Sequence, residues 1–396
     1  MQEFQQATIA HHGITPTLGD AHERVLSRKD FADAIGEITQ WDGYEATPLA
    51  DLAHLAAQIN VGQVLYKHEG PRFGLASFKA LGGSYAALRV LQREISARAG
   101  HAVTLADIRE GKHADAAAQI TLVSATDGNH GRSLAWGCKA FGAPCRIYIH
   151  AEVSEGRAQA MRAYGAEVIR IAGDYDASVA LARKEAEEND WFVVSDTSWP
   201  GYSEPPRDVM AGYGVMTNEV NVALAQAPTH VFLQGGVGGL AASVAANLRQ
   251  HWGADAPRVV IVEPDLAACL YESAVKGAAT AVSIDRETIM AGLSCGEPSE
   301  MAWEILAEEA TDFLCIPDNI VAPTVRLLAR PGGDDMAIDA GESAVAGLAA
   351  AIAAALQPDL RATLGLTDSS RILLIGSEGI TDPDIFEQIM KGANFD

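Results

Sequence analysis

The sequence predicts an α/β protein built on doubly wound parallel sheets. Three observations support this: short apolar runs alternate with helical stretches from about residue 120, glycine, proline or acidic residues follow each run, and 396 residues exceed what one hydrophobic core usually serves. Alternating strands and helices form crossover units with parallel strands, and ligands bind at the carboxyl ends of those strands. We therefore expect two lobes or one large α/β unit.

The elements follow from the apolar periodicity along the chain. The segment up to about residue 84 is predicted to be helix-rich, and the alternation begins after it. Strands are predicted over residues 119–125, 145–150, 166–171, 191–194, 230–233, 259–262, 313–316 and 372–375. Helices are predicted over residues 81–93, from 129 onward, and over 156–164, 177–188, 240–249 and 344–356. This order predicts a large domain of residues 1–84 and 190–396 and a small α/β domain of residues 85–189.

Composition excludes several classes of function. The chain has 52 acidic and 29 basic side chains, and its net charge of −23 opposes binding to nucleic acid or to a membrane surface. There is no apolar run of membrane-spanning length and no signal-like N-terminus, so we expect a cytoplasmic protein. Five cysteines without C-x-x-C spacing predict no metal site and no disulfide framework, although Cys269 and Cys295 could meet in space.

A glycine loop, Gly235 to Gly239, lies between a predicted strand and a predicted helix. Missing side chains let the backbone approach an anion, and the helix N-terminus supplies N–H groups. A flexible turn is an equally good interpretation of this loop alone. The Walker lysine is missing and the glycine spacing is not that of a dinucleotide fingerprint, so ATP and NAD are disfavoured.

Lys79 follows Ser77 and Phe78 and immediately precedes a predicted helix. The helix dipole and partial burial would disfavour its ammonium form, which is what Schiff-base formation requires. A single lysine is most often a solvated surface cation. Together with a phosphate cradle, however, a reactive amine indicates pyridoxal phosphate.

A polar segment, residues 124–131, lies where the predicted strand 119–125 meets the helix predicted from residue 129. It offers an amide, an acid and exposed N–H groups at one strand end. An ordinary helix cap made by Asp127 or Asn129 is the alternative.

Four motifs resemble those of the fold type II pyridoxal-phosphate enzymes, in the same order and over nearly the whole chain: residues 77–79, 127–131, 235–239 and 376–379. Further segments resemble the diaminopropionate ammonia-lyase family: residues 72–75, 126–132, 195–199, 212–213 and 289–298. The acid at position 127 is the distinguishing feature, because a small residue is more usual there. The resemblance implies two doubly wound, three-layer lobes with the cofactor between them, and a homodimer.

The resemblance also implies the cofactor contacts. Lys79 would form the Schiff base, Phe78 would lie against the pyridine ring and Ser377 would meet the ring nitrogen. Asn129 would reach the ring hydroxyl, and the phosphate would be held by Gly235, Gly236, Val237, Gly238 and Gly239. A neutral hydroxyl does not keep the ring nitrogen protonated as a carboxylate would, so elimination is favoured over prolonged transamination.

The implied reaction is α,β-elimination of D- and L-2,3-diaminopropionate to pyruvate and ammonia. Lys79 and Asp127 would act as bases on opposite faces, and Asp127 and Asp196 would hold the β-ammonium group. The remaining substrate contacts would be Ser124, Thr126, Gly128 and His130, with His130 alternatively a residue that only orients its neighbours.

Three other functions stay open on the sequence: a serine or threonine dehydratase, a β-replacement synthase, and a cofactor-free binding or regulatory protein. If Arg207 faced the pocket, a substrate with an additional carboxylate would also be possible.

Overall fold

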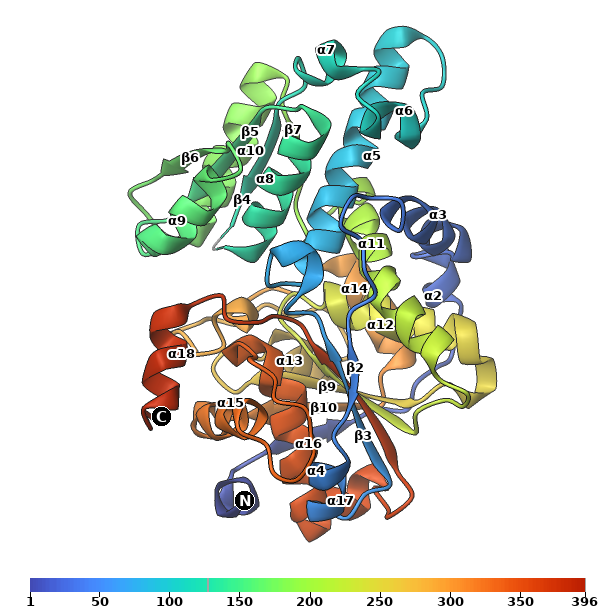
Figure 1. Cartoon of the computed structure of the whole chain (residues 1–396), viewed down its shortest axis with the longest axis vertical. Helices are drawn as coiled ribbons and strands as arrows, with labels where there is room; N and C mark the ends of the chain where they lie inside the picture. Colours follow the sequence, from blue (N-terminus) through green and yellow to red (C-terminus); the bar gives the residue numbers. More distant parts are fainter. Residues whose placement is uncertain (127, 396) are drawn as a thin grey trace. The chain divides into compact units, whose positions relative to one another are not determined.

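The computed structural model describes residues 1–126 and 128–395, and the chain divides into two compact units (Figure 1). Unit 1 comprises Met1–Arg28, Glu45–Phe78 and Met216–Asp396, and unit 2 comprises Lys29–Tyr44 and Lys79–Val215.

Unit 1 is built on a seven-stranded sheet. Five strands are parallel: β3 (Gln63–His68), β8 (His230–Gln234), β9 (Arg258–Pro264), β10 (Asp312–Ile316) and β11 (Arg371–Gly376). The edge strands β1 (Ala10–Gly13) and β2 (Leu49–Asp51) are antiparallel to β10 and β3, which gives the order β1-β10-β9-β8-β11-β3-β2. The four predicted parallel strands, β8 to β11, are confirmed, whereas β1, β2 and β3 lie in a segment predicted to be helix-rich.

Helices cover the unit 1 sheet. The alanine-rich α16 (Ala346–Leu356) is buried along ten consecutive residues and contacts β8 to β11. Its approach is close, since a Cβ atom at Gly347 would lie 2.7 Å from the Phe232 carbonyl oxygen. The other helices are α1 (Gln2–Gln6), α2 (Ala21–Arg24), α4 (Ala53–Gln58), α12 (Gly239–Trp252), α13 (Cys269–Lys276), α14 (Glu300–Glu309), α15 (Val321–Ala329), α17 (Pro358–Leu364) and α18 (Pro383–Met390).

Unit 2 holds a parallel four-stranded sheet in the order β6-β5-β4-β7. Its strands are β4 (Leu122–Ala125), β5 (Cys145–Ile149), β6 (Glu167–Arg170) and β7 (Phe192–Val193). Side chains alternate between the two faces: Ile147 approaches α8 (Asn129–Phe141), while Tyr148 lies in a cluster with α10 (Tyr175–Asn189). This part of the chain is therefore doubly wound (Figure 1). The other helices are α3 (Arg28–Ile38), α5 (Lys79–Ala99), α6 (Leu105–Arg109), α7 (Ala114–Ala117), α9 (Glu155–Arg162) and α11 (Glu204–Ala223), of which the part from Met216 on belongs to unit 1.

The unit boundaries differ from the domain boundaries predicted at residues 84 and 190. Helix α5 is continuous from Lys79 to Ala99 and lies along α8, so the longer of the two segments of unit 2 begins at the first residue of that helix. Strand β7 completes the four-stranded sheet, which brings residues 190–215 into unit 2.

Within the described residues, no single helix is long and apolar enough to span a membrane. The helical stretches Glu342–Leu356 and Pro358–Leu364 reach the required length and composition only together, and they are bent by 109°.

Candidate active site

Lys79 lies at a helix N-terminus, as predicted, but the helix α5 begins at Lys79 itself and not at residue 81. Two glycines let neighbouring helices approach this end closely: a Cβ atom at Gly82 would lie 2.4 Å from the Tyr213 ring, and one at Gly83 would lie 2.7 Å from Ser133 Oγ. Ser133 Oγ also donates to the Lys79 carbonyl oxygen at 2.5 Å. Tight packing and this hydrogen bond therefore fix the backbone that carries the amine.

The Lys79 side chain is only 24% exposed, and its Nζ forms an ion pair with Asp196 Oδ2. Burial alone would raise the pKa of the Asp196 carboxyl, but the Lys79 ammonium outweighs it and holds that pKa well below its usual range. The structure therefore brings together two of the three predicted catalytic residues, with the carboxylate ionised.

His130 lies beside this pair, in the first turn of α8. Its Nε2 is 2.9 Å from the Val194 carbonyl oxygen, and since a carbonyl only accepts, Nε2 carries the hydrogen. Burial lowers the pKa of His130, and Nδ1 lies 3.9 Å from Asp196 Oδ2. His130 is thus a neutral, buried imidazole whose Nδ1 lone pair faces the carboxylate.

The loop that carries Asp196 is held by two aromatic residues. The Tyr202 hydroxyl accepts a hydrogen bond from the Ser195 N–H at 3.0 Å and donates to the Val193 carbonyl at 2.9 Å. The Trp199 ring stacks on Tyr202, with 3.9 Å between ring centroids and 10° between ring planes. These two rings therefore fix the turn after β7.

The predicted substrate segment lies between β4 and α8. Thr126 Oγ1 accepts from the Gly128 N–H at 3.2 Å, and Asn129 Oδ1 accepts from the Arg132 guanidinium at 3.1 Å. Ser124 is completely buried, which counts against direct contact between its hydroxyl and a substrate. Asn129 is the first residue of α8 and Gly128 is its N-cap residue. The alternative prediction that Asn129 caps this helix is therefore wrong.

Asp127, the third predicted catalytic residue, lies outside the described residues. Arg207 is half-buried and is the fourth residue of α11.

The glycine loop of unit 1 has the predicted strand–turn–helix form. Strand β8 ends at Gln234 and the fourteen-residue helix α12 begins at Gly239. Gly238 has φ +95°, a conformation that strains other residues, and a Cβ atom at Gly235 would lie 2.7 Å from a Leu270 methyl carbon. The loop therefore requires glycine, and it presents backbone N–H groups at a positive helix end.

Two further predicted cofactor contacts, Phe78 and Ser377, are neighbours in unit 1. The Phe78 N–H donates to the Ser377 carbonyl at 2.9 Å, and Ser77 forms a β-bridge with Glu378. Ser377 follows β11, next to the end of β8, and its Oγ accepts a hydrogen bond from Gln234 Nε2 at 2.9 Å. The ends of β8 and β11 thus place Ser377 beside the glycine loop.

These residues fit pyridoxal phosphate. The glycine loop at the start of α12 suits a phosphate dianion, and the Ser377 hydroxyl suits the ring nitrogen. Gln234 Oε1 is buried and has no hydrogen-bond partner within residues 1–126 and 128–395, as expected of an atom next to a ligand or water site. In unit 2, Lys79 is three-quarters buried beside a carboxylate and is an amine of the kind that this cofactor requires.

A buried ionic network in unit 1 was missed by the sequence analysis. Arg72 is 1% exposed and donates to Glu69 at 2.8 Å and to Glu219 at 2.9 Å. It also donates to Thr47 Oγ1 at 3.1 Å, and Lys67 Nζ contacts Glu219. Glu219 is 147 residues from Arg72, so no local pattern reveals the pairing.

This network anchors a strained segment that leads to Phe78. Phe73 and Ala76, with φ of 50° and 51°, are in the left-handed region without being glycine. Such residues each cost roughly 1–3 kcal/mol and persist only when their surroundings enforce them. The Arg72 network holds this segment at residue 72, and the hydrogen bond between Phe78 and Ser377 holds it at residue 78.

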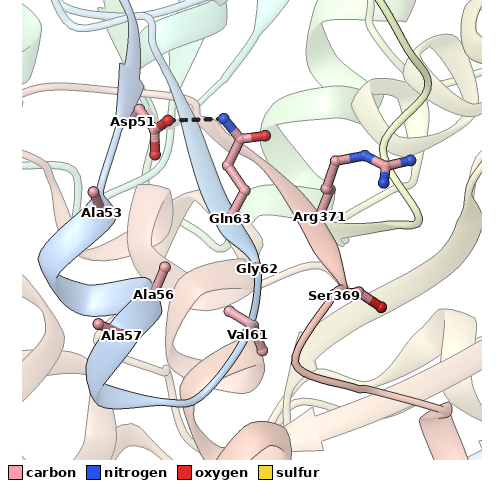
Figure 2. Close-up of a pocket in the computed structure, with 9 residues that line it drawn as sticks. All are labelled: Asp51, Ala53, Ala56, Ala57, Val61, Gly62, Gln63, Ser369 and Arg371. Carbon is pink, nitrogen blue, oxygen red and sulfur yellow. Dashed lines mark hydrogen bonds between the residues drawn. The ribbon is translucent and has the colours of Figure 1, made fainter.

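A pocket of about 420 Å³ opens where strands β3 and β11 of the unit 1 sheet begin, at the end opposite Ser377 (Figure 2). Its lining includes Gln63 and Arg371, the first residues of β3 and β11, and Gln63 donates to Asp51 at 2.7 Å. Figure 2 shows the alanines of α4 along one side. Ligands of parallel sheets bind at the carboxyl ends of strands, so this pocket is separate from the predicted site.

Comparison with known proteins places the chain in a family. The family model described as pyridoxal-phosphate dependent enzyme matches residues 40–377. The chain is 37% identical over 354 residues to diaminopropionate ammonia-lyase of Escherichia coli strain K12, covering 88% of each protein. It is 38% identical over 361 residues to the Salmonella typhimurium strain LT2 enzyme of the same name, again covering 88% of each.

A solved structure extends the similarity to the fold. The chain matches Escherichia coli diaminopropionate ammonia-lyase in complex with an aminoacrylate–PLP azomethine reaction intermediate, with a TM-score of 0.86, 32% identity and 97% of each chain covered. The α/β architecture of fold type II, expected from the sequence, is thereby confirmed. The chain belongs to the pyridoxal-phosphate dependent enzymes and, within them, to the diaminopropionate ammonia-lyase family.

Proposed function

We propose that this protein eliminates ammonia from D- and L-2,3-diaminopropionate and yields pyruvate and a second ammonia. The observation that carries the proposal is the ion pair between Lys79, at the start of α5, and an ionised, largely buried Asp196. It places an amine able to exchange protons next to a negative charge that suits a cationic leaving group. Family membership supplies the substrate.

The cofactor is pyridoxal phosphate, with Lys79 as its attachment point. The phosphate is assigned to Gly235, Gly236, Val237, Gly238 and Gly239, the ring to Phe78 and Ser377, and the ring hydroxyl to Asn129. When bound, pyridoxal phosphate withdraws electrons from the α-carbon of the substrate and so makes the α-proton removable. Ser377 offers a neutral hydroxyl to the ring nitrogen, which suits elimination.

Lys79 Nζ accepts the α-proton from one face of the substrate. As the electron pair of the broken Cα–H bond forms a Cα–Cβ double bond, the Cβ–N bond breaks and its electrons leave with nitrogen. An amine leaves readily only when protonated, so the substrate reacts as its β-ammonium form, which the Asp196 carboxylate holds. Water then hydrolyses the released enamine, by way of its imine tautomer, to pyruvate and the second ammonia.

Asp127 is proposed as the base for the opposite enantiomer. It lies one residue before Gly128, the N-cap of α8. Thr126, Gly128 and His130 are proposed to bind substrate at this helix N-terminus, where an α-carboxylate is stabilised by free N–H groups. Asp127→Asn should abolish turnover of one enantiomer and spare the other, whereas full turnover of both would exclude Asp127 as a base.

A dehydratase acting on serine or threonine is the second candidate. Escherichia coli diaminopropionate ammonia-lyase has been solved in complex with D-serine, so that relative binds a hydroxy amino acid. A hydroxyl leaving group, however, carries no positive charge, so it gains no ion pair with Asp196. We therefore expect the ammonium-bearing substrate to react faster.

The direct test is product formation from each enantiomer of 2,3-diaminopropionate. Purified protein with pyridoxal phosphate should release pyruvate and two equivalents of ammonia, and D-serine, L-serine and L-threonine should react more slowly. Faster release of keto acid from serine or threonine would favour the dehydratase. Turnover only with an added nucleophile would indicate a β-replacement synthase, and absence of any turnover would refute an enzymatic role.

We also propose that the protein forms a homodimer and is located in the cytoplasm. The family resemblance supports the dimer, which sedimentation equilibrium tests, and cell fractionation tests the location.

A further inference from the structure

We propose that Gln234 is a positioning residue that turns the hydroxyl proton of Ser377 toward the ring nitrogen of the cofactor. The inference rests on the proposed function, because it concerns the same cofactor. Gln234 is the last residue of β8 and immediately precedes the glycine loop.

The hydrogen bonds of the Gln234 amide fix its orientation. Its Nε2 lies 2.7 Å from the Ile375 carbonyl oxygen and 2.9 Å from Ser377 Oγ. Because a carbonyl oxygen can only accept, the atom that faces it must be the NH2 group, and the amide cannot be reversed. The same NH2 group can only donate, so Ser377 Oγ is the acceptor.

The Ser377 hydroxyl consequently keeps its one proton for another partner. Gln234 and Ser377 are only 3% and 4% exposed, so bulk water is largely excluded from both. Within the two described ranges of the chain, the hydroxyl makes no hydrogen bond other than the one it accepts from Gln234. The remaining proton is available to the ring nitrogen that Ser377 is proposed to meet.

This arrangement selects the protonation state of the ring. A hydroxyl that donates to the ring nitrogen requires the nitrogen lone pair, hence an unprotonated ring. If Ser377 donated to the side chain at position 234 instead, its oxygen would face the ring and would favour a protonated nitrogen. Gln234 thus maintains the weaker electron sink that suits elimination.

The test compares cofactor binding and the state of the ring nitrogen in three variants. Gln234→Met removes the NH2 donor at similar length, Ser377→Ala removes the hydroxyl, and the double variant combines them. Gln250→Met is the matched control, because Gln250 Nε2 is also buried and donates to two backbone carbonyls, at 2.7 and 2.8 Å. The readouts are the dissociation constant of pyridoxal phosphate from the protein and the 15N resonance of ring-labelled cofactor bound to it.

Gln234→Met should weaken cofactor binding roughly fivefold, the equivalent of about 1 kcal/mol, and should change it less than twofold when Ser377 is already alanine. Gln250→Met should change neither readout. The inference would be overturned if Gln234→Met weakened cofactor binding by the same factor with and without the Ser377 hydroxyl. Such a result would show that Gln234 acts independently of that hydroxyl.

A reversal variant provides the second readout. In Gln234→Glu a carboxylate replaces the NH2 donor, so Ser377 should donate to it, and the ring 15N resonance should move upfield toward the protonated position. An unchanged resonance in a variant that binds cofactor would refute the inference. If Gln234→Glu does not fold, the dissociation constants of Gln234→Met, Ser377→Ala and the double variant decide the question. Failure of the wild-type protein to bind pyridoxal phosphate would refute the proposed function instead.

Discussion

Replacing Asp196 by asparagine removes one negative charge while keeping the size of the side chain. In the structure that charge pairs with Lys79 and faces His130 Nδ1 at 3.9 Å. We assign it to the β-ammonium group of the substrate, so the variant should bind the leaving group less well in both the ground state and the transition state.

The magnitude follows from the strength of a charged hydrogen bond in a largely buried site. Such a bond contributes about 1.5–3 kcal/mol. The kcat/KM for 2,3-diaminopropionate should therefore fall roughly 10- to 150-fold.

The decisive assay compares this decrease with that for β-chloroalanine, which carries no cationic β-substituent. Removal of the Lys79 partner affects both substrates, whereas removal of the charge that holds the β-ammonium group affects diaminopropionate alone. We expect the fall for diaminopropionate to exceed the fall for β-chloroalanine by roughly tenfold or more. Asp190→Asn is the matched control, because Asp190 is exposed and adopts a left-handed conformation that asparagine tolerates. Equal decreases for both substrates would refute the assignment of Asp196 to the leaving group.

Two further predictions concern stability. Arg72→Ala would leave the carboxylates of Glu69 and Glu219 buried without their guanidinium, so the free energy of unfolding in urea should fall by about 3–5 kcal/mol, and a change below about 1 kcal/mol would contradict the role of the network. Burial raises the pKa of Glu263 from 4.5 to about 8, so the folded state holds a proton that the unfolded state releases, and this contribution to stability is lost as pH rises from about 4.5 to about 8. Glu263→Gln should flatten that part of the curve of stability against pH, and an unchanged slope would show that Glu263 is already ionised.

Much of the fold could be predicted because most parallel strands are continuous apolar runs. Residues 259–262 and 313–316 are recognised in this way, and β9 and β10 lie there. Strand β3 was missed because Lys67 and His68 interrupt its pattern. The buried Lys67 is paired with Glu219, 152 residues later, and this pairing is not visible locally.

The residues of the candidate site likewise fall into a group that the sequence predicts and a group that it does not. Lys79, the glycine loop and Ser377 lie at junctions between regular elements, where helix starts and glycine spacing are visible in the sequence. The positions of Gln234 and Arg72 depend on contacts between segments 143 and 147 residues apart. Such contacts form only when strands and helices assemble, so their effect on the site emerged from the structure alone.

The proposed function depends most directly on the chemistry of one amine. Reduction of the protein loaded with pyridoxal phosphate by borohydride, followed by mass analysis of its peptides, should place the pyridoxyl group on Lys79 and on no other lysine. A cofactor fixed to another lysine, or an unmodified Lys79 in fully loaded protein, would contradict the assignment of Lys79 as the attachment point.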